Sequence, residues 1–227
     1  MHYVQRLLRN PGVPYVVPFV VFLVFLALQK INPLPAVAEG PLRLILLSAV
    51  LYVFSKRVID LHATALAPST LVGIAVFAIW ILPDVLFPQY RQHWLFQNAV
   101  TGRLSSSLAV PDRLDGIVIG SRILRTVVLV PIIEELFWRA WLMRWLISPK
   151  FYGVRLGAYQ AQSFWITALM FAAEHGPFWD VGLIAGIAYN WWMVRTRSLG
   201  DCILAHAVTN ACLCGYVLAT HRWEYWL

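Results

Sequence analysis

The stretch VPIIEELFWRAWL, residues 130–142, lies inside a long apolar run and yet carries two adjacent glutamates and an arginine. A charge at the centre of a bilayer costs about 2.5–3.5 kcal/mol on insertion scales, so ionisable side chains in such a run need partners or a function. Glu135 and Arg139 are four residues apart with the glutamate first, which lets them pair on one helix face. The sequence therefore predicts an ion pair between Glu135 and Arg139.

Glu134 needs another explanation, because consecutive helical residues point about 100° apart and Arg139 cannot readily serve both carboxylates. One interpretation is structural: Glu134 makes a polar contact between helices. The other is that Glu134 lines a hydrated cavity, where a buried carboxylate can act as a general base.

The composition is that of a membrane protein. Of the 227 residues, 60% are apolar and only 13% are charged, and the mean hydropathy is +0.67. A soluble domain of this length would need far more charged surface, so the lipid bilayer is the expected surrounding. The net charge of +7 comes from basic residues placed singly or in pairs at the ends of apolar segments, which indicates topology signals and no nucleic-acid partner. Cys202, Cys212 and Cys214 lack zinc-site spacing and are expected to be packing residues.

Apolar runs separated by Pro, Gly and charge predict an all-α, polytopic integral membrane bundle of about seven transmembrane helices, with eight as the alternative. We expect one integral membrane domain over residues 1–227, with the catalytic motifs in about 116–219. The first run could instead be a secretory signal, because Arg6 and Arg9 precede it and an Ala-x-Ala sequence follows at 36–38. Its length favours a spanning helix. The seven runs are 13–30, 42–58, 69–88, 116–147, 159–175, 180–196 and 200–219.

The distribution of basic residues favours a cytoplasmic N-terminus, because most basic residues on the other side belong to one long segment, 88–125. Within that segment TGRLSSSLAVPDRLDG, residues 101–116, predicts an extramembrane loop. The basic residues on the predicted inner side are Arg6, Arg9, Lys56, Arg57, Arg144, Lys150, Arg155, Arg195 and Arg197.

Two later runs supply polar partners for Glu134. LMFAAEHGPF, residues 169–178, places His175 near the end of a helix, just before a Gly-Pro pair breaks it, and Glu174 is expected to tip toward the polar helix end. LAHAVTNA, residues 204–211, places His206 and Asn210 on one helix face, where both can donate hydrogen bonds to a developing oxyanion. A single histidine on an apolar helix is as readily a packing residue, so the argument depends on the set.

The positions of the two histidines create a geometric tension. His175 ends its helix and His206 lies near the start of a later one, so they would lie at different depths if the run 180–196 spans fully. The site can form only if the turn at 176–180 dips into the membrane, or if the neighbouring helices are short or tilted.

Three motifs carry a family resemblance. EELFWR, FAAEH and HAVTN fit E-E-x-x-x-R, F-x-x-x-H and H-x-x-x-N in that order, over about residues 130–211. They resemble the CPBP family of intramembrane proteases, which includes the CAAX-processing endoprotease and the Abi proteins. EELFWRAWLMRWL and the tail LAHAVTNACLCGYVLATHRWEYW further resemble a bacterial CAAX protease-related subgroup found with exosortase systems. That subgroup implies a multi-pass protein of the bacterial inner (cytoplasmic) membrane.

The resemblance implies a cofactor-free, glutamate-type intramembrane protease. Glu134 and His175 would activate a water, while His206 and Asn210 would stabilise the tetrahedral oxyanion. The implied substrate is a membrane-associated protein or peptide, with the exosortase (C-terminal sorting) pathway as its source; prenylation of the substrate and the oligomeric state of the chain are not determined by the sequence. The residues with implied supporting roles are Glu135, Arg139 and Phe171.

Two alternatives remain open at the level of sequence. Glu134, His175 and His206 also form a ligand set for zinc with an open position for water, although no H-E-x-x-H motif is present. Carboxylates and histidines inside membranes also build proton-coupled transporters, and a non-proteolytic scaffold could keep the same polar cluster. A transporter usually shows polar, interrupted helices in both halves, whereas this chain has them in its C-terminal half.

Overall fold

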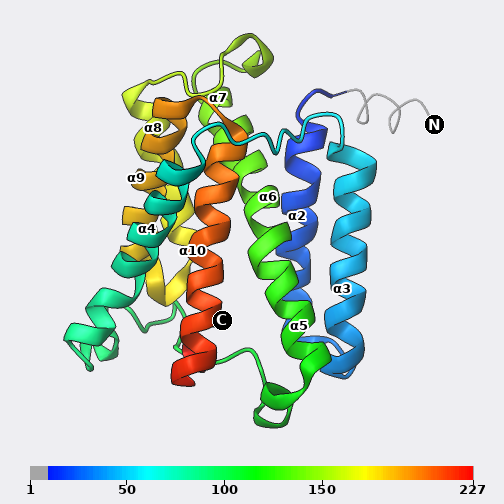
Figure 1. Ribbon diagram of the computed structural model, residues 1–227, viewed down its shortest axis with the longest axis vertical. Coiled ribbons are helices and arrows are strands. Elements are labelled where there is room, and N and C mark those ends of the chain that lie inside the picture. Colours follow the sequence, from blue (N-terminus) through cyan, green and yellow to red (C-terminus); the bar gives the residue numbers. More distant parts are fainter. Residues whose placement is uncertain (1–9, 227) are drawn as a thin grey trace.

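The computed structural model describes residues 10–226, so Arg6 and Arg9 lie outside the described residues. The predicted all-α fold is confirmed: between residues 10 and 226 the chain forms helices and no strand, apart from an isolated bridge between Asn98 and Gly102. Each of the seven predicted runs is helical. The α-helices are α2 (Val13–Leu28), α3 (Ala36–Val50), α4 (Leu66–Leu86), α5 (Gly116–Leu124), α6 (Val130–Glu135), α7 (Met143–Trp145), α8 (Ala161–Glu174), α9 (Trp179–Thr196) and α10 (Leu199–Thr220) (Figure 1).

Four helical segments are long and apolar enough to cross a membrane: Ala36–Ser55, Leu66–Leu86, Gly116–Trp145 and Leu199–Thr220. The apolar helix α2 is shorter, and α8 has only 14 residues, or about 21 Å, against an apolar bilayer core of about 30 Å. The predicted number of seven spanning helices is therefore not confirmed. The short α8 bears directly on the depth of His175.

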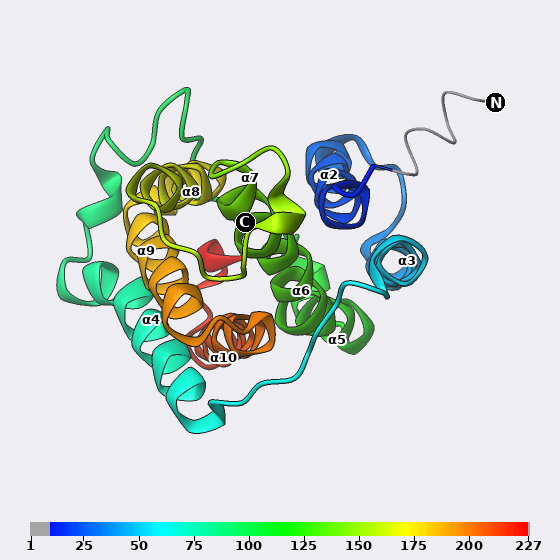
Figure 2. The same ribbon diagram turned by 90° about the horizontal axis from the view of Figure 1, so that it is seen from above.

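The helices form two groups on either side of one long helix. Helices α4, α8, α9 and α10 lie together, with close packing of α10 on α4 and of α8 on α9, while α2 and α3 lie on the opposite side (Figures 1 and 2). The continuous helix Gly116–Trp145, which contains α5, α6 and α7, runs between the groups. It therefore contacts both groups.

Two π-helical segments interrupt this long helix, Arg125–Leu129 and Leu136–Leu142, and they bracket α6. Pro131 stands in the first turn of α6, where its missing N–H and its ring would strain a regular helix; a wider π turn just before it relieves that strain. Asp115 begins the long helix by accepting hydrogen bonds from the backbone N–H groups of Ile117 and Val118, at 2.8 and 3.1 Å. Local sequence signals thus set both the start of this helix and its irregular centre.

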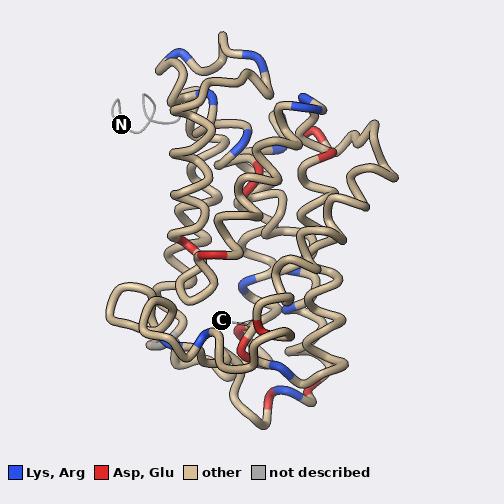
Figure 3. Tube along the Cα trace, turned by 90° about the vertical axis from the view of Figure 1, so that its left-hand side faces the viewer, with Lys and Arg blue, Asp and Glu red and all other residues tan. Residues whose placement is uncertain are grey.

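The surface suits a lipid surrounding. Large apolar side chains on α3 and α4 are exposed, among them Ile45, Leu71 and Ile74, as expected where acyl chains cover the helices. Charged residues gather toward the two ends of the bundle, but some also lie at mid-height (Figure 3). The cysteines behave as predicted: all three are free, with Cys202 and Cys214 buried.

The segment 87–115 packs against the turn that follows α8. Residues 101–116 form no long helix, which confirms the predicted loop, and in the preceding part the side chains of Arg91 and Phe96 are buried. Arg91 is the centre of this contact: its Nε lies 2.8 Å from Asp84, and its Nη1 lies 2.7 Å from Asp180 and 2.8 Å from the Pro177 carbonyl oxygen. Tyr225 donates a hydrogen bond to the same Asp84 carboxylate at 2.9 Å. Burial, and then the neighbouring Asp84 carboxylate, raise the pKa of Tyr225 above its ordinary value, which keeps the phenol protonated as the donor.

These contacts determine how deep His175 lies within the bundle. Because α8 is short and the following turn is covered by segment 90–102, His175 lies inside the bundle instead of at its surface. Pro177 and Phe178 are buried, and Gly176 approaches the carbonyl oxygen of Thr101 closely with φ of +52°. Of the geometries open at the level of sequence, the structure adopts a short helix followed by a turn buried within the protein.

Candidate active site

Four of the predicted residues line one cavity of about 220 Å³. Glu134 comes from α6, His175 from the C-terminal end of α8, and His206 and Asn210 from α10. The structure therefore gathers side chains from three separate helices around one space large enough for water and part of a peptide. The other polar residues of the lining are Arg122, Arg125, Thr126, Glu174, Tyr189, Thr209 and Tyr225.

Glu134 is the acid of the pair that faces this cavity. Its side chain is 4% exposed, and its Oε2 has no hydrogen-bond partner among the described residues. A buried carboxylate oxygen normally accepts a hydrogen bond, and burying such an oxygen without one costs free energy. The carboxylate as a whole lines the cavity, where it is suited to accept a proton from water.

His175 is oriented by its own helix. Its Nδ1 lies 2.7 Å from the carbonyl oxygen of Phe171, one turn earlier. Since a carbonyl can only accept, Nδ1 carries the proton and Nε2 of the neutral ring has the free lone pair. The rings of Phe171 and Trp80 pack against the imidazole, with centroids 4.6 and 5.2 Å away. Phe171, predicted to support the site, therefore contributes both the carbonyl and the ring that position His175.

The predicted ion pair between Glu135 and Arg139 is present, with Arg139 Nη1 3.0 Å from Glu135 Oε1 and both side chains fully buried. Arg139 also donates from Nε to Asn190 Oδ1 at 3.1 Å. Its guanidinium lies over the rings of Phe171 and Tyr189, 4.5 and 5.3 Å from the centroids. A buried charge of this kind is stable only when it is paired and hydrogen-bonded, as Arg139 is.

Glu135 has a second partner, His206. The imidazole Nδ1 lies 2.8 Å from Glu135 Oε1, and the ring stacks on Tyr189 with centroids 5.0 Å apart. Tyr189 is fixed in turn by its hydroxyl, which donates to Thr209 Oγ1 at 2.7 Å. The carboxylate accepts the Nδ1 proton of His206, so Nε2 is the nitrogen left for the cavity.

Asn210 lies one helical turn after His206 on the cavity side of α10. Its Nδ2 donates to the carbonyl oxygen of Thr126, in the first π-helical segment, at 2.9 Å. A carboxamide has two N–H groups, so this bond fixes the amide and leaves one donor. His206 and Asn210 are therefore positioned as neighbouring groups on one wall of the cavity.

The expectation for Glu174 was wrong. It does not tip toward a polar helix end: it lines the cavity, and both of its carboxylate oxygens are buried, with the Trp138 indole as a neighbouring donor. It interacts electrostatically with Glu134. The cause is the short α8, which ends inside the bundle and not at the membrane surface.

Sequence reasoning also missed Asn190, Tyr189 and the two arginines Arg122 and Arg125. Asn190 carried a usable signal, since it is a carboxamide in the apolar run 180–196; it accepts from Arg139 and donates to the Phe164 carbonyl at 2.8 Å. Arg122 and Arg125 fall in the predicted helical run 116–147 but were counted only as basic residues of the segment 88–125, and both line the cavity.

A metal ion held by the same residues is the alternative left open at the level of sequence. Over the described part of the chain, no group of three or more His, Cys, Asp or Glu side chains is arranged to hold a metal ion. His206 directs Nδ1 to Glu135 and His175 directs Nδ1 to a backbone carbonyl, which leaves both Nε2 atoms free, as in histidines that bind metals. The arrangement of Glu134, His175 and His206, and not the orientation of the two rings, therefore gives no support to a zinc site.

Comparison with known proteins agrees with the three motifs. Residues 118–212 match the model of the Type II CAAX prenyl endopeptidase Rce1-like family, a segment of less than half of the chain that contains all four candidate catalytic residues. The search of curated proteins gave no significant match, and neither did the search of solved structures. With the four apolar helices, this match indicates a multi-pass membrane protein. In the segment that carries the site, the chain is similar to the Rce1-like family of CAAX endopeptidases.

Proposed function

We propose that this protein is an intramembrane endopeptidase that hydrolyses a peptide bond with an activated water. The observation that carries the proposal is the convergence of Glu134, His175, His206 and Asn210 on one cavity of about 220 Å³. The similarity of residues 118–212 to an endopeptidase family supports peptidase activity independently of that geometry.

Glu134 and His175 are proposed to activate the water. The Glu134 carboxylate, which lines the cavity, accepts a proton as the water oxygen attacks the scissile carbonyl carbon. His175, whose Nδ1 is tied to Phe171, offers Nε2 to orient the same water. The proton held on Glu134 then passes to the leaving nitrogen as the C–N bond breaks, so no covalent intermediate with the protein is needed.

His206 and Asn210 are proposed to stabilise the negative charge that develops on the carbonyl oxygen. Asn210 supplies its remaining N–H group. His206 donates from Nε2 in the form that carries protons on both nitrogens, with its Nδ1–H held by the Glu135 carboxylate at 2.8 Å. Each such donor typically contributes about 10²–10³ in rate. Glu135 and Arg139 thus act as positioning residues behind His206.

The cavity also suggests the class of substrate. Apolar side chains supply much of its lining, including Phe22 and Leu26 of α2, Trp80 of α4 and Leu213 of α10. An apolar peptide segment of a membrane-associated protein would bury its side chains against them. We propose such a segment as the substrate, and proteins of the exosortase (C-terminal sorting) pathway as the first candidates.

The test compares wild type with Glu134→Gln in membranes that contain candidate exosortase-pathway proteins. New protein termini are identified by mass spectrometry, and Glu224→Gln, which removes a half-exposed carboxylate outside the cavity, serves as the matched control. We expect new termini with wild type and Glu224→Gln and none with Glu134→Gln. Cleavage that survives Glu134→Gln would overturn the proposal, as would cleavage abolished by a chelator and restored by zinc, which would support the metal alternative. If no variant cleaves while a partner still binds, a non-proteolytic scaffold is the better account.

A further inference from the structure

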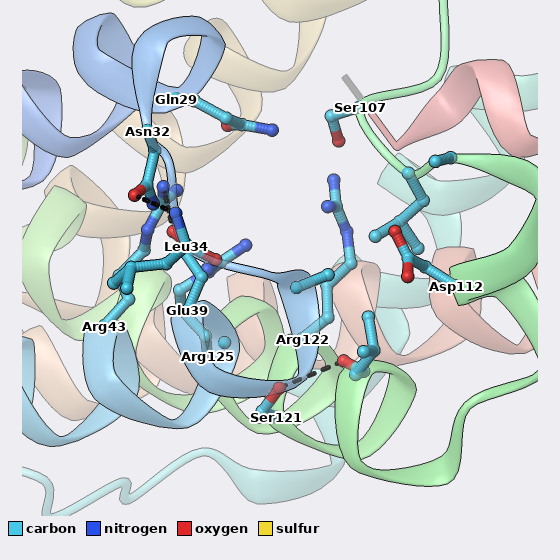
Figure 4. Close-up of a pocket in the computed structure, with 15 residues that line it drawn as sticks. Gln29, Asn32, Leu34, Glu39, Arg43, Ser107, Asp112, Ser121, Arg122 and Arg125 are labelled. Atoms are coloured by element: carbon cyan, nitrogen blue, oxygen red, sulfur yellow. Dashed lines mark hydrogen bonds and ion pairs between the residues drawn. The ribbon is translucent and has the colours of Figure 1, made fainter.

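A second cavity, of about 350 Å³, lies on the other side of the helix that carries Arg122 and Arg125. It is bounded by α3, by α5 and the π-helical segment that follows it, and by the segment 107–112 (Figure 4). In Figure 4, Glu39 and Arg43 lie on one side of this space, Ser107 and Asp112 lie on the other, and Arg122 projects between them. Since Arg122 and Arg125 line both cavities, the second cavity adjoins the candidate active site.

The charges in this second cavity are unbalanced. Three guanidinium groups, those of Arg43, Arg122 and Arg125, face two carboxylates, those of Glu39 and Asp112. Glu39 forms an ion pair with Arg43 and attracts Arg122 and Arg125 at longer range. Arg122 has a further interaction of its own, so Arg125 is the guanidinium of the three that lacks a close counter-charge.

Arg125 is the most unusual of the three. Its side chain is 8% exposed, and it forms no hydrogen bond or ion pair with any other residue in the range 10–226. Burying a cation without a counter-charge is strongly unfavourable, so a buried arginine that faces a cavity indicates an anion as the missing partner. Its planar guanidinium is suited to bind two oxygens of one phosphate.

An apolar groove of about 310 Å³ adjoins this cavity and shares Asn32, Leu34, Glu39 and Arg43 with it. Its remaining walls are Phe25 and Leu28 of α2, Leu42 of α3, and the residues Ile31 and Pro33 that join the two helices. Leu28, Ile31 and Leu42 are exposed, so the groove opens to the lipid surrounding. A polar cavity beside an open apolar groove has the shape of a site for an amphipathic molecule.

The depth of the arginines suits a lipid headgroup. The 30-residue helix Gly116–Trp145 is about 45 Å long, which exceeds the apolar core of about 30 Å and leaves several ångströms at each end in the headgroup region. Arg122 follows Gly116 by six residues, or about 9 Å, so its guanidinium can reach the headgroup level. Arg125, one turn deeper, points into the same cavity.

We propose that this cavity binds the phosphate group of an anionic membrane lipid, with Arg125 as its main ligand and an acyl chain in the groove between α2 and α3. The bound phosphate supplies the counter-charge that Arg125 lacks, and the lipid covers the side of the active-site cavity formed by Arg122 and Arg125. A peptide carboxylate would also satisfy Arg125, but it would leave the lipid-facing groove without a role.

The test measures thermal unfolding and lipid binding of the purified, delipidated full chain in detergent. Phosphatidylglycerol is compared with phosphatidylcholine, and glycerol 3-phosphate serves as the same anion without acyl chains. The variants are Arg125→Gln and Arg125→Lys, with Arg57→Gln as the matched control, because Arg57 is an exposed arginine that lines neither cavity. Native mass spectrometry gives the lipid preference of wild type without relying on any variant.

We expect phosphatidylglycerol to raise the unfolding temperature of wild type and of Arg57→Gln, with about tenfold weaker binding in Arg125→Gln, which corresponds to the loss of one charge-assisted contact. Arg125→Lys keeps the charge and should bind with intermediate strength. Without anionic lipid, Arg125→Gln should be at least as stable as wild type, because it no longer buries an unpaired cation. Equal binding by wild type and Arg125→Gln would overturn the proposal. So would an absence of preference for phosphatidylglycerol in wild type, glycerol 3-phosphate binding as tightly as the lipid, or displacement by a peptide with a free carboxylate alone.

Discussion

Glu135 lies 2.8 Å from Nδ1 of His206, so a fully buried acid fixes the imidazole that lines the active-site cavity. The same oxygen pairs with Arg139 at 3.0 Å. Of the two adjacent glutamates, one therefore faces the cavity and the other holds the groups behind it. The two acids are given separate tasks because neighbouring residues on a helix point in different directions.

The Glu135→Gln variant should separate the effect of the negative charge of Glu135 from the effect of its hydrogen bond to His206. Glutamine still offers an oxygen to His206 Nδ1, but it removes the negative charge beside the imidazole that faces the developing oxyanion, so we expect cleavage to slow by about 10²-fold or more. Arg139 also loses its counter-charge, and breaking a buried pair costs about 3–5 kcal/mol of unfolding free energy. Cleavage rates and denaturant unfolding measure the two effects. The half-exposed pair of Arg222 and Glu224 provides the control, since Glu224→Gln should cost less than about 1 kcal/mol. Cleavage at the wild-type rate by Glu135→Gln would contradict the role given to His206.

Two asparagine variants should differ in whether they lower the cleavage rate or the stability more. Asn210→Ala removes an oxyanion donor and one hydrogen bond to Thr126, so the rate should fall by about 10²–10³ while stability changes by about 1 kcal/mol. Asn190→Ala leaves Arg139 Nε without its acceptor in a fully buried position and removes the second hydrogen bond to the Phe164 carbonyl, so it should cost more stability than Asn210→Ala. Rate and unfolding free energy are measured for both. If Asn210→Ala loses stability but keeps its rate once folded, Asn210 is structural.

Gly176→Ala should displace His175. Gly176 has φ of +52°, a conformation that costs an alanine roughly 1–2 kcal/mol, and a Cβ there would lie 2.8 Å from the carbonyl oxygen of Thr101. We expect reduced stability and a slower rate, because the turn beside His175 must shift. Gly120→Ala is the matched control: a Cβ there meets open space within a helix, and the change should stabilise by about 0.5–1 kcal/mol. A neutral effect of Gly176→Ala on cleavage would show that the turn does not position His175.

Glu174→Gln tests the carboxylate that sequence reasoning missed. Both of its oxygens are buried, and it repels Glu134 when both are charged. We expect a folded protein at least as stable as wild type, because the substitution removes a buried charge, with cleavage kept within about tenfold. Unfolding and turnover provide the readout. A variant as inactive as Glu134→Gln would instead make Glu174 part of the water-activating machinery.

The sequence predicted those features of the structure that local sequence patterns control. The seven apolar runs became helices, the spacing of Glu135 and Arg139 predicted their ion pair, and the motif residues Glu134, His175, His206 and Asn210 line one cavity. These follow from periodicity and from the cost of charges in an apolar surrounding, both of which can be judged one segment at a time.

What depends on contacts between distant segments could not be predicted. The depth of His175 follows from a short α8 and from Arg91, whose partners Asp84 and Asp180 lie far apart in the sequence. The second partner of Glu135, the cavity position of Glu174 and the cavity around Arg125 likewise arise only when separate helices pack together. The spacing of residues within one helix does not indicate which other helix will pack against it.

The central claim is that Glu134 and His175 act on one water in one cavity, and a double-mutant cycle on cleavage tests it most directly. Rates are measured for wild type, Glu134→Gln, His175→Ala and the double variant on one substrate, with folding of each verified by unfolding. Because residues that act as a unit are strongly non-additive, the double variant should be about as slow as Glu134→Gln alone. If the two losses multiply instead, the residues act independently and the shared-water account is contradicted.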